Sequence, residues 1–213
     1  MSPAFLAGAA LTIVCTAGLM AAEWRGSQRG KWATKPFAAL GFVLAALGAG
    51  ALDSAYGQVV LAGLVLSLCG DLLLIPKSSK TFLGGLVAFL LGHVAFVVAF
   101  VVRGPDVTRA LVALPVVLLS SGLALRWLAP HVEAPMKGPV AAYVLVISAM
   151  VVCAAGASVK PGGIVGLVGA LMFYASDLAV ARDRFVAHVF SNRAWGLPLY
   201  FGGQLVIAAS IPG

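Results

Sequence analysis

The sequence predicts an all-α integral membrane protein, a bundle of eight transmembrane helices forming a single transmembrane domain over residues 1–213. Apolar residues make up 62% of the chain and charged residues only 10%, and the mean hydropathy is +1.05. In a soluble domain, about a quarter of the residues are charged. The apolar residues fall into eight stretches, each near the roughly 20 residues that a helix needs to cross a bilayer. The connections are short, so consecutive helices are expected to be antiparallel neighbours.

The eight expected spans cover residues 3–22, 36–52, 57–75, 82–102, 109–128, 138–157, 162–181 and 194–211. The first ends near Ala21 and Ala22 as a signal peptide does, but it lacks a basic leading region and has the length of a full crossing. The second is the shortest of the eight. The third and the seventh each contain an aspartate, the fourth contains a histidine, and the sixth and eighth contain tyrosines.

The basic residues predict the orientation of the bundle. Eleven flank the expected inner ends of the spans: Arg25, Arg29, Lys31, Lys35, Lys77, Lys80, Arg126, Lys137, Arg182, Arg184 and Arg193. Only Arg103, Arg109 and Lys160 lie on the opposite side. By the positive-inside rule, the side with eleven charges is cytoplasmic and both termini lie on the non-cytoplasmic side. The net charge of +7 thus reflects topology and lipid headgroups, and no nucleic acid partner is expected. The short loops favour a bacterial chain in the inner (cytoplasmic) membrane.

Two aspartates inside apolar spans are the main functional signal. An ionisable side chain at membrane depth is costly, which makes Asp71 and Asp177 functional-site candidates. Each lies about four residues from the expected inner end of its span, which places it roughly 6 Å below the cytoplasmic boundary. Tyr143 and Tyr200 enter from that side at similar depth, and His93 lies nearer the middle of the bilayer.

The surroundings of the two aspartates favour burial and indicate a weak internal repeat. Small residues flank both at helical spacing: Gly63, Ser67 and Gly70 before Asp71, and Gly166 and Ala170 before Asp177. Small residues let helices approach closely in lipid, so both carboxyls are expected to point into the bundle. Lys35-Pro36 before the second span is echoed by Lys137-Gly138-Pro139 at the sixth, and the two aspartates close the third and seventh. Together these pairs suggest a parallel four-plus-four repeat.

A set of short motifs then carries a resemblance. The pieces are Lys35-Pro36, Gly70-Asp71-Leu72-Leu73, Gly92-His93, Pro139 with Tyr143, Gly169 to Phe173, Ser176-Asp177-Leu178-Ala179, Arg184-Phe185, and Tyr200 with Gln204. In this order and spacing, the chain resembles the lysoplasmalogenase (YhhN-like) family of multi-pass membrane proteins. One departure is Phe96, where the family often has tyrosine. The resemblance implies hydrolysis of the vinyl ether bond of lysoplasmalogens to a fatty aldehyde and glycerophosphoethanolamine or glycerophosphocholine. The partners would be a lysophospholipid substrate, water and membrane lipid.

The chemistry of that reaction fits two carboxyls. Acid cleaves a vinyl ether by protonating the carbon beta to the ether oxygen, which leaves an oxocarbenium-like cation that water attacks. One protonated carboxyl can supply the proton and one carboxylate can stabilise the cation, as in glycosidases. Asp71 and Asp177 are the catalytic candidates, and the sequence does not say which of them is the acid. Candidates for binding the substrate phosphate are Lys35, Arg182, Arg184 and Lys77, and candidates for lining the site are His93, Tyr143, Tyr200 and Gln204.

Other interpretations remain open at this stage. Either aspartate could simply bond a neighbouring helix, and the basic residues could be topology signals. The main functional alternative is a proton-coupled multi-pass transporter that uses the two aspartates, and a third is a non-catalytic lipid-binding or scaffold protein. No metal and no cofactor are expected, because three scattered histidines and three cysteines within apolar spans show no ligand spacing. Asp53, Asp106, Glu133 and Asp183 fall in loops and are expected to be solvated. The oligomeric state is left open.

Overall fold

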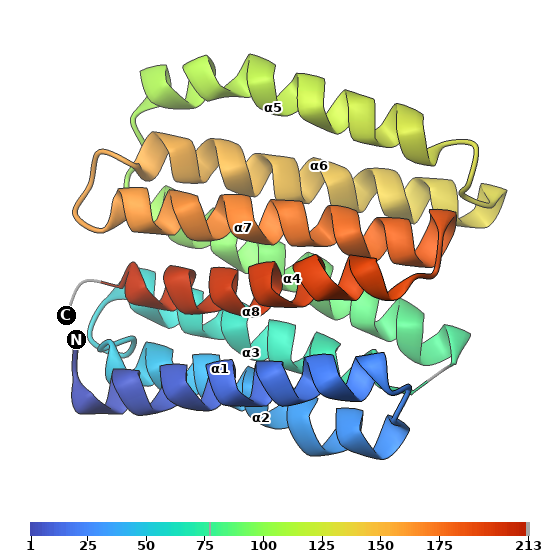
Figure 1. Cartoon of the computed structure of the whole chain (residues 1–213). Helices are drawn as coiled ribbons and strands as arrows, with labels where there is room; N and C mark the ends of the chain where they lie inside the picture. The colour runs from blue at the N-terminus through green and yellow to red at the C-terminus, as the bar shows by residue number, and fades with distance from the viewer. Residues whose placement is uncertain (77, 212–213) are drawn as a thin grey trace.

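The computed structural model describes residues 1–76 and 78–211, and in this part of the chain the ordered elements are helices (Figure 1). They are α1 (Pro3–Trp24), α2 (Gln28–Gly48), α3 (Ala55–Leu73), α4 (Ser79–Val102), α5 (Val107–Leu128), α6 (Ala134–Ala157), α7 (Gly163–Ala181), a π-helical turn η1 (Arg182–Val186) and α8 (Phe190–Ala209). In Figure 1 the helices run back and forth between the same two ends, and the start of α1 and the end of α8 lie at one end. The all-helical membrane bundle predicted from the sequence is confirmed.

Six of the described helices are long and apolar enough to cross a membrane by length and composition: α1, α3, α4, α5, α6, and α7 with η1. The remaining two, α2 and α8, have 21 and 20 residues. They begin with polar or charged turns, which lowers their mean hydropathy, but they run alongside the others between the same ends. Helix α8 packs against α1, α2, α3 and α7, and is therefore central to the bundle.

Two helix starts differ from the expected spans, and both changes matter for the site. Helix α2 begins at Gln28 instead of residue 36, because the hydroxyl of Ser27 caps it by accepting a hydrogen bond from the Gly30 amide. Lys35 consequently lies within a helix and not in a loop. Helix α8 begins at Phe190 instead of residue 194, which brings Arg193 into its first turn. Hydropathy alone assigns such charged first turns to the loops.

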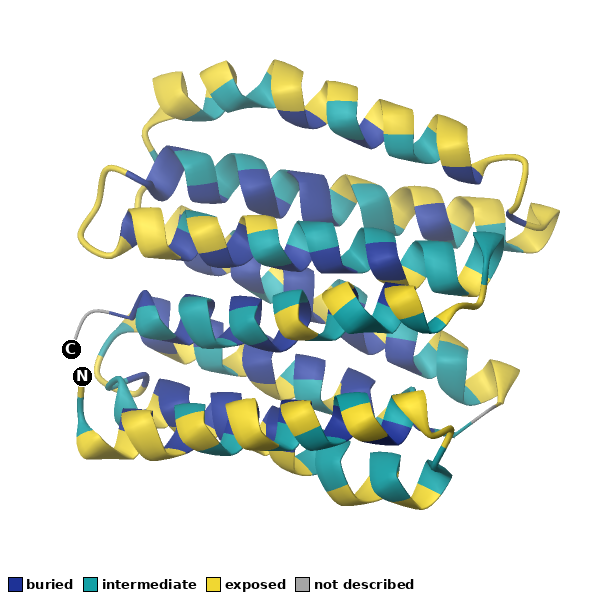
Figure 2. Cartoon of the chain, viewed as in Figure 1, coloured by how far each residue is buried: buried dark blue, intermediate teal, exposed yellow. Residues whose placement is uncertain are grey.

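Close approach of α3 and α4 depends on small residues on α3. A Cβ atom on Gly63 would come within 2.6 Å of the Phe96 ring, and one on Gly70 within 2.7 Å of the Phe89 ring. These contacts confirm that the face of α3 that carries Asp71 is packed inside the bundle. Figure 2 shows the complementary pattern, with exposed residues along the outward faces of α1 and α5. Many of these exposed residues are large and apolar, including Leu111, Val112 and Val116, as expected of a surface that contacts lipid tails.

Candidate active site

Asp71 lies two residues before the end of α3 and is 1% exposed. The ammonium nitrogen of Lys35, from α2, is 3.1 Å from its Oδ1. The hydroxyl of Tyr200, from α8, donates a hydrogen bond to its Oδ2 at 2.6 Å. Both partners are hydrogen-bond donors. A buried carboxylate is tolerated when it is both ion-paired and hydrogen-bonded, and Asp71 meets both conditions.

Asp177 lies on α7 and has a different set of partners. The hydroxyl of Tyr143, from α6, donates a hydrogen bond to Oδ2 at 2.9 Å. The Nε2 atom of His93, from α4, is 3.5 Å from the same oxygen. Among the described residues, no lysine or arginine forms an ion pair with Asp177. Its side chain keeps 17% exposure, whereas that of Asp71 keeps 2%, so Asp177 is the carboxyl more accessible from outside the packed core.

The two carboxyls lie on either side of a cluster of aromatic rings. The Phe173 ring centroid is 4.4 Å from that of His93 and 5.3 Å from that of Tyr200. Within residues 1–76 and 78–211, no hydrogen bond joins one aspartate to the other. The structure thus gathers Asp71, Asp177, Lys35, His93, Tyr143 and Tyr200 at one site, but it gives each aspartate its own environment. The link between them runs through Phe173, whose ring contacts one partner of each.

Gln204 is a further buried polar residue near this site. It lies one helical turn after Tyr200 on α8 and is fully buried, and neither amide atom has a hydrogen-bond partner in the described part of the chain. A buried amide without a partner costs about 1–3 kcal/mol. Such groups in native proteins usually bind water or a ligand, which makes Gln204 a candidate for binding a polar part of a substrate.

The predicted phosphate-binding residues are divided by the structure. Lys35 is the one placed directly at a carboxyl. Arg182 donates a hydrogen bond to the side-chain oxygen of Asn192, and the guanidinium of Arg184 lies 4.2 Å from the centroid of the Phe82 ring. Neither contacts Asp71 or Asp177. The fourth candidate, Lys77, lies outside the described residues.

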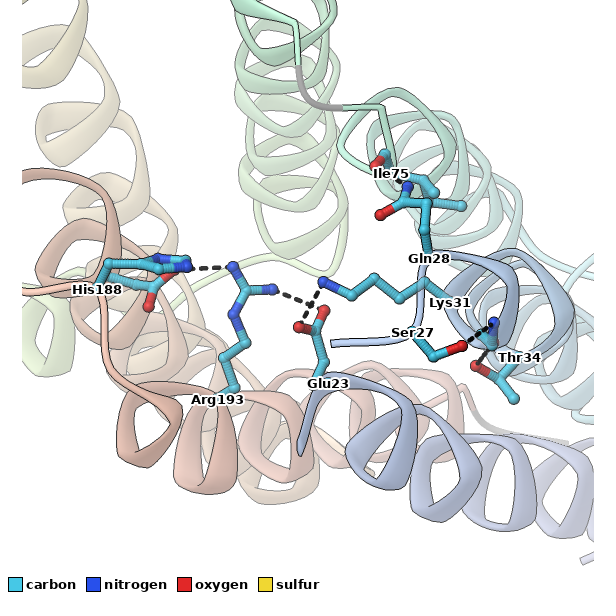
Figure 3. Close-up of polar contacts among 10 residues, drawn as sticks. Glu23, Ser27, Gln28, Lys31, Thr34, Ile75, His188 and Arg193 are labelled. Atoms are coloured by element: carbon cyan, nitrogen blue, oxygen red, sulfur yellow. Dashed lines mark hydrogen bonds and ion pairs between the residues drawn. The ribbon is translucent and has the colours of Figure 1, made fainter. Parts of the chain in front are cut away.

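A polar cluster at the basic end of the bundle was missed by the sequence analysis (Figure 3). Glu23, at the end of α1, pairs with Lys31 of α2 and with Arg193 of α8, both at 2.7 Å. Arg193 also reaches Asp183 of η1 at 2.9 Å, and the side chain of Asp183 is only 13% exposed. The expectation that Asp183 is solvated is therefore wrong. The sequence does carry a signal for this cluster, because Glu23 lies at the end of an apolar span and close to several basic residues.

This polar cluster fixes the helices that carry the site. It joins α1, α2, α8 and η1, and the side chain of Gln28 adds a hydrogen bond to the carbonyl of Ile75 at 2.7 Å. Gln28 begins α2, and Ile75 follows the end of α3. The start of α2 is consequently held against the end of α3, which places Lys35 beside Asp71.

A polytopic helical bundle with paired carboxyls, tyrosines and a lysine in its interior is a membrane protein with an intramembrane polar site. The YhhN family model matches residues 30–211, which include both aspartates and their partners, and the chain belongs to the YhhN family. No solved structure matches the chain.

Several curated proteins are similar to this chain. It is 30% identical over 157 residues to lysoplasmalogenase TMEM86A of Bos taurus, covering 71% of this chain and 64% of that protein. It is 35% identical over 155 residues to a lysoplasmalogenase of Mycobacterium bovis, with 68% and 57% covered. It is 32% identical over 155 residues to lysoplasmalogenase TMEM86B of Homo sapiens, with 73% and 64% covered. The chain therefore spans about 57–64% of the length of these relatives.

Proposed function

We propose that this protein is a membrane-embedded hydrolase that cleaves the vinyl ether bond of lysoplasmalogens. The products are a fatty aldehyde and glycerophosphoethanolamine or glycerophosphocholine. The observation that carries the proposal is the pair of intramembrane carboxyls at one site, Asp71 and Asp177, in unlike electrostatic surroundings. The names of the curated relatives support the same reaction.

The proposed mechanism uses one carboxyl as an acid and the other as a carboxylate. The acid delivers its proton to the beta carbon of the vinyl ether, and the second carboxylate stabilises the resulting cation. Water then adds to the carbon attached to the ether oxygen and loses a proton to the spent acid. The hemiacetal breaks into aldehyde and alcohol, and the remaining proton of the water goes to the glycerol oxygen. No other reactant is needed.

The proposed binding mode follows the polarity of the bundle. The lipid tail lies along apolar helix surfaces, the vinyl ether lies at the carboxyls, and the phosphate lies at the basic end, near Arg182 and Arg184. Gln204 offers a free donor and a free acceptor, which suit the glycerol hydroxyl of a lysolipid. The main role of Lys35 is its ion pair with Asp71, and its predicted role as a phosphate ligand is secondary. We place the protein in a bacterial inner membrane with this basic end facing the cytoplasm.

The first experiment is aldehyde release from a 1-alkenyl lysophospholipid by the purified protein. Asp71→Asn and Asp177→Asn should each lower turnover by about 100-fold or more while the protein still elutes as a folded species. Asp53→Asn is the matched control, because Asp53 is an exposed loop residue, and it should keep full activity. In heavy water, the aldehyde should carry deuterium on the carbon next to the carbonyl.

Two outcomes would contradict the proposal. Full activity in either intramembrane variant would remove the paired-carboxyl mechanism. Absence of aldehyde from the wild-type protein with every 1-alkenyl lysophospholipid tried would remove the hydrolase itself. Proton-coupled uptake into vesicles would then be the alternative to measure, with the same three variants.

A further inference from the structure

The ring of His93 has a defined tautomer in this structure. Its Nδ1 atom lies 2.7 Å from the backbone carbonyl oxygen of Phe89, one helical turn earlier on α4. A carbonyl oxygen can only accept a hydrogen bond, so Nδ1 must carry the hydrogen. In the neutral imidazole, the other nitrogen, Nε2, then presents a lone pair. His93 is 1% exposed, which keeps bulk water from this nitrogen.

That nitrogen lies 3.5 Å from Oδ2 of Asp177, and it has no hydrogen-bond partner among the described residues. A carboxylate oxygen and an unprotonated ring nitrogen are both acceptors and repel each other at this distance, whereas a single proton between them turns the contact into a hydrogen bond. The Tyr143 hydroxyl donates its hydrogen to the same Oδ2 atom and so does not satisfy Nε2. One proton placed between the two atoms would remove this repulsion and give Nε2 a partner.

The Asp71 site shows the opposite arrangement. Its two partners, the ammonium of Lys35 and the hydroxyl of Tyr200, both donate to the carboxyl. Two donors, one of them a cation, suit an ionised carboxylate that only accepts. Neither of these described partners presents an unprotonated nitrogen that would hold a proton on Asp71. The two carboxyls of the site are thus distinguished by the hydrogen-bonding direction of their partners.

We propose that His93 and Asp177 share one proton, and that this pair is the proton donor of the reaction while Asp71 acts as the carboxylate. This assignment rests on the proposed hydrolase function. The O–H bond of Asp177 breaks as a C–H bond forms at the beta carbon of the vinyl ether, and the double-bond electrons supply that new bond. Asp177 is then a carboxylate next to His93, and it recovers a proton from the water that adds to the cation. His93 is a positioning residue in this step, since it holds the shared proton on Asp177 and does not touch the substrate.

The shared proton can be observed without any activity. The protein contains three histidines, so labelling them with an NMR-active nitrogen isotope gives few signals, which single-histidine variants assign. The wild type should show His93 with hydrogen on Nδ1 and with Nε2 shifted by a hydrogen bond to Asp177. Asp177→Leu should move the Nε2 signal to the position of a free ring nitrogen, and Asp71→Leu should leave it in place. A hydrogen on Nε2 alone, or no response to Asp177→Leu, overturns the proposal.

A variant of His93 then separates positioning of the proton from support of the fold. His93→Asn places an amide nitrogen near the position of Nδ1, which keeps a donor for the Phe89 carbonyl but removes the ring nitrogen that faces Asp177. Aldehyde release should fall by about 100-fold or more with the unfolding temperature close to that of the wild type. The control is His131→Asn, because His131 makes the same type of contact to the carbonyl of Trp127, at 3.2 Å, but is exposed.

The outcomes distinguish this inference from the proposed function. If the wild type is active and His93→Asn is equally active, the shared proton has no role and the assignment fails, while the hydrolase stands. If the wild type releases no aldehyde, the hydrolase fails, and the NMR experiment still decides whether the proton is shared.

Discussion

The Asp71 and Asp177 sites have the same construction and different chemistry. If the chain is divided into a half with α1 to α4 and a half with α5 to α8, each aspartate lies on the third helix of its half. Each takes one partner from the second helix of the same half, which is Lys35 for Asp71 and Tyr143 for Asp177. Each takes the other from the fourth helix of the opposite half, which is Tyr200 for Asp71 and His93 for Asp177.

The spacing along the chain is also similar in the two halves. His93 follows Asp71 by 22 residues, and Tyr200 follows Asp177 by 23. The parallel four-plus-four repeat expected from the sequence is therefore visible in the partners of the aspartates. The sites differ in the partner that the second helix of each half provides. Asp71 pairs with the Lys35 cation, whereas Asp177 accepts a hydrogen bond from the Tyr143 phenol. The two halves thus hold their carboxyls in corresponding positions, with partners of different chemistry.

The largest expected effect comes from removing the cation that one site has and the other lacks. Lys35→Met leaves the Asp71 carboxylate buried without a counter-charge, which should lower the free energy of unfolding by about 3–5 kcal/mol. The thermal unfolding of the purified protein in detergent measures the loss. The double variant Lys35→Met with Asp71→Leu should recover most of the stability but no activity. Equal stability of wild type and Lys35→Met would show that Asp71 is not ionised.

The sequence alone identifies most residues of this site, but it does not show which of them contact one another. Asp71, Asp177 and Lys35 stand out because charged residues are rare within or beside apolar spans. Their partners cannot be assigned locally, since Tyr200 contacts Asp71 across a separation of 129 residues. Lys35 was assigned to a lipid phosphate because hydropathy placed it outside the second span, whereas the capped start of α2 draws it inside.

The apolar pattern predicted the end of α7 but not the turn that follows it. Both spans were expected to end about four residues after their aspartates, and α7 does end at Ala181, whereas α3 ends two residues after Asp71. After Ala181 the chain continues into the π-helical η1, which ends nine residues after Asp177. A π-helical turn depends on local backbone geometry and tertiary contacts, for which a single sequence carries no periodic signal.

A matched pair of tyrosine variants tests the difference in charge directly. Tyr200→Phe removes a hydrogen bond to an ionised group and should lower the free energy of unfolding by about 1.5–3 kcal/mol. Tyr143→Phe removes a hydrogen bond to a carboxyl that holds a proton and should lower it by only about 0.5–1.5 kcal/mol. Chemical or thermal unfolding under identical detergent conditions gives both values. A larger loss in Tyr143→Phe would reverse the assignment of the two carboxyls.

A smaller effect of opposite sign is expected at Gln204, which lies one helical turn after Tyr200 on α8. The corresponding residue on α4, one turn after His93, is the apolar Val97. Gln204→Leu removes two buried polar atoms without partners and should raise the free energy of unfolding without substrate by about 1–2 kcal/mol. The Michaelis constant should rise about tenfold with little change in turnover, because the lost contact binds the substrate and takes no part in the chemistry. A stability loss would mean that Gln204 has a structural partner.

The smallest effect concerns η1, the π-helical extension of α7. Arg184 of η1 lies over the Phe82 ring at the start of α4, so this contact joins the extension of α7 to the helix that carries His93. Arg184 is exposed, and an exposed cation–π contact contributes about 0.5–1 kcal/mol. Arg184→Ala should therefore change stability by no more than this amount. If Arg184 also binds the substrate phosphate, the Michaelis constant should rise and its dependence on salt should weaken. An unchanged Michaelis constant at all salt concentrations would leave Arg184 with only its contact to Phe82, and would move the phosphate site toward the remaining basic residues at this end of the bundle.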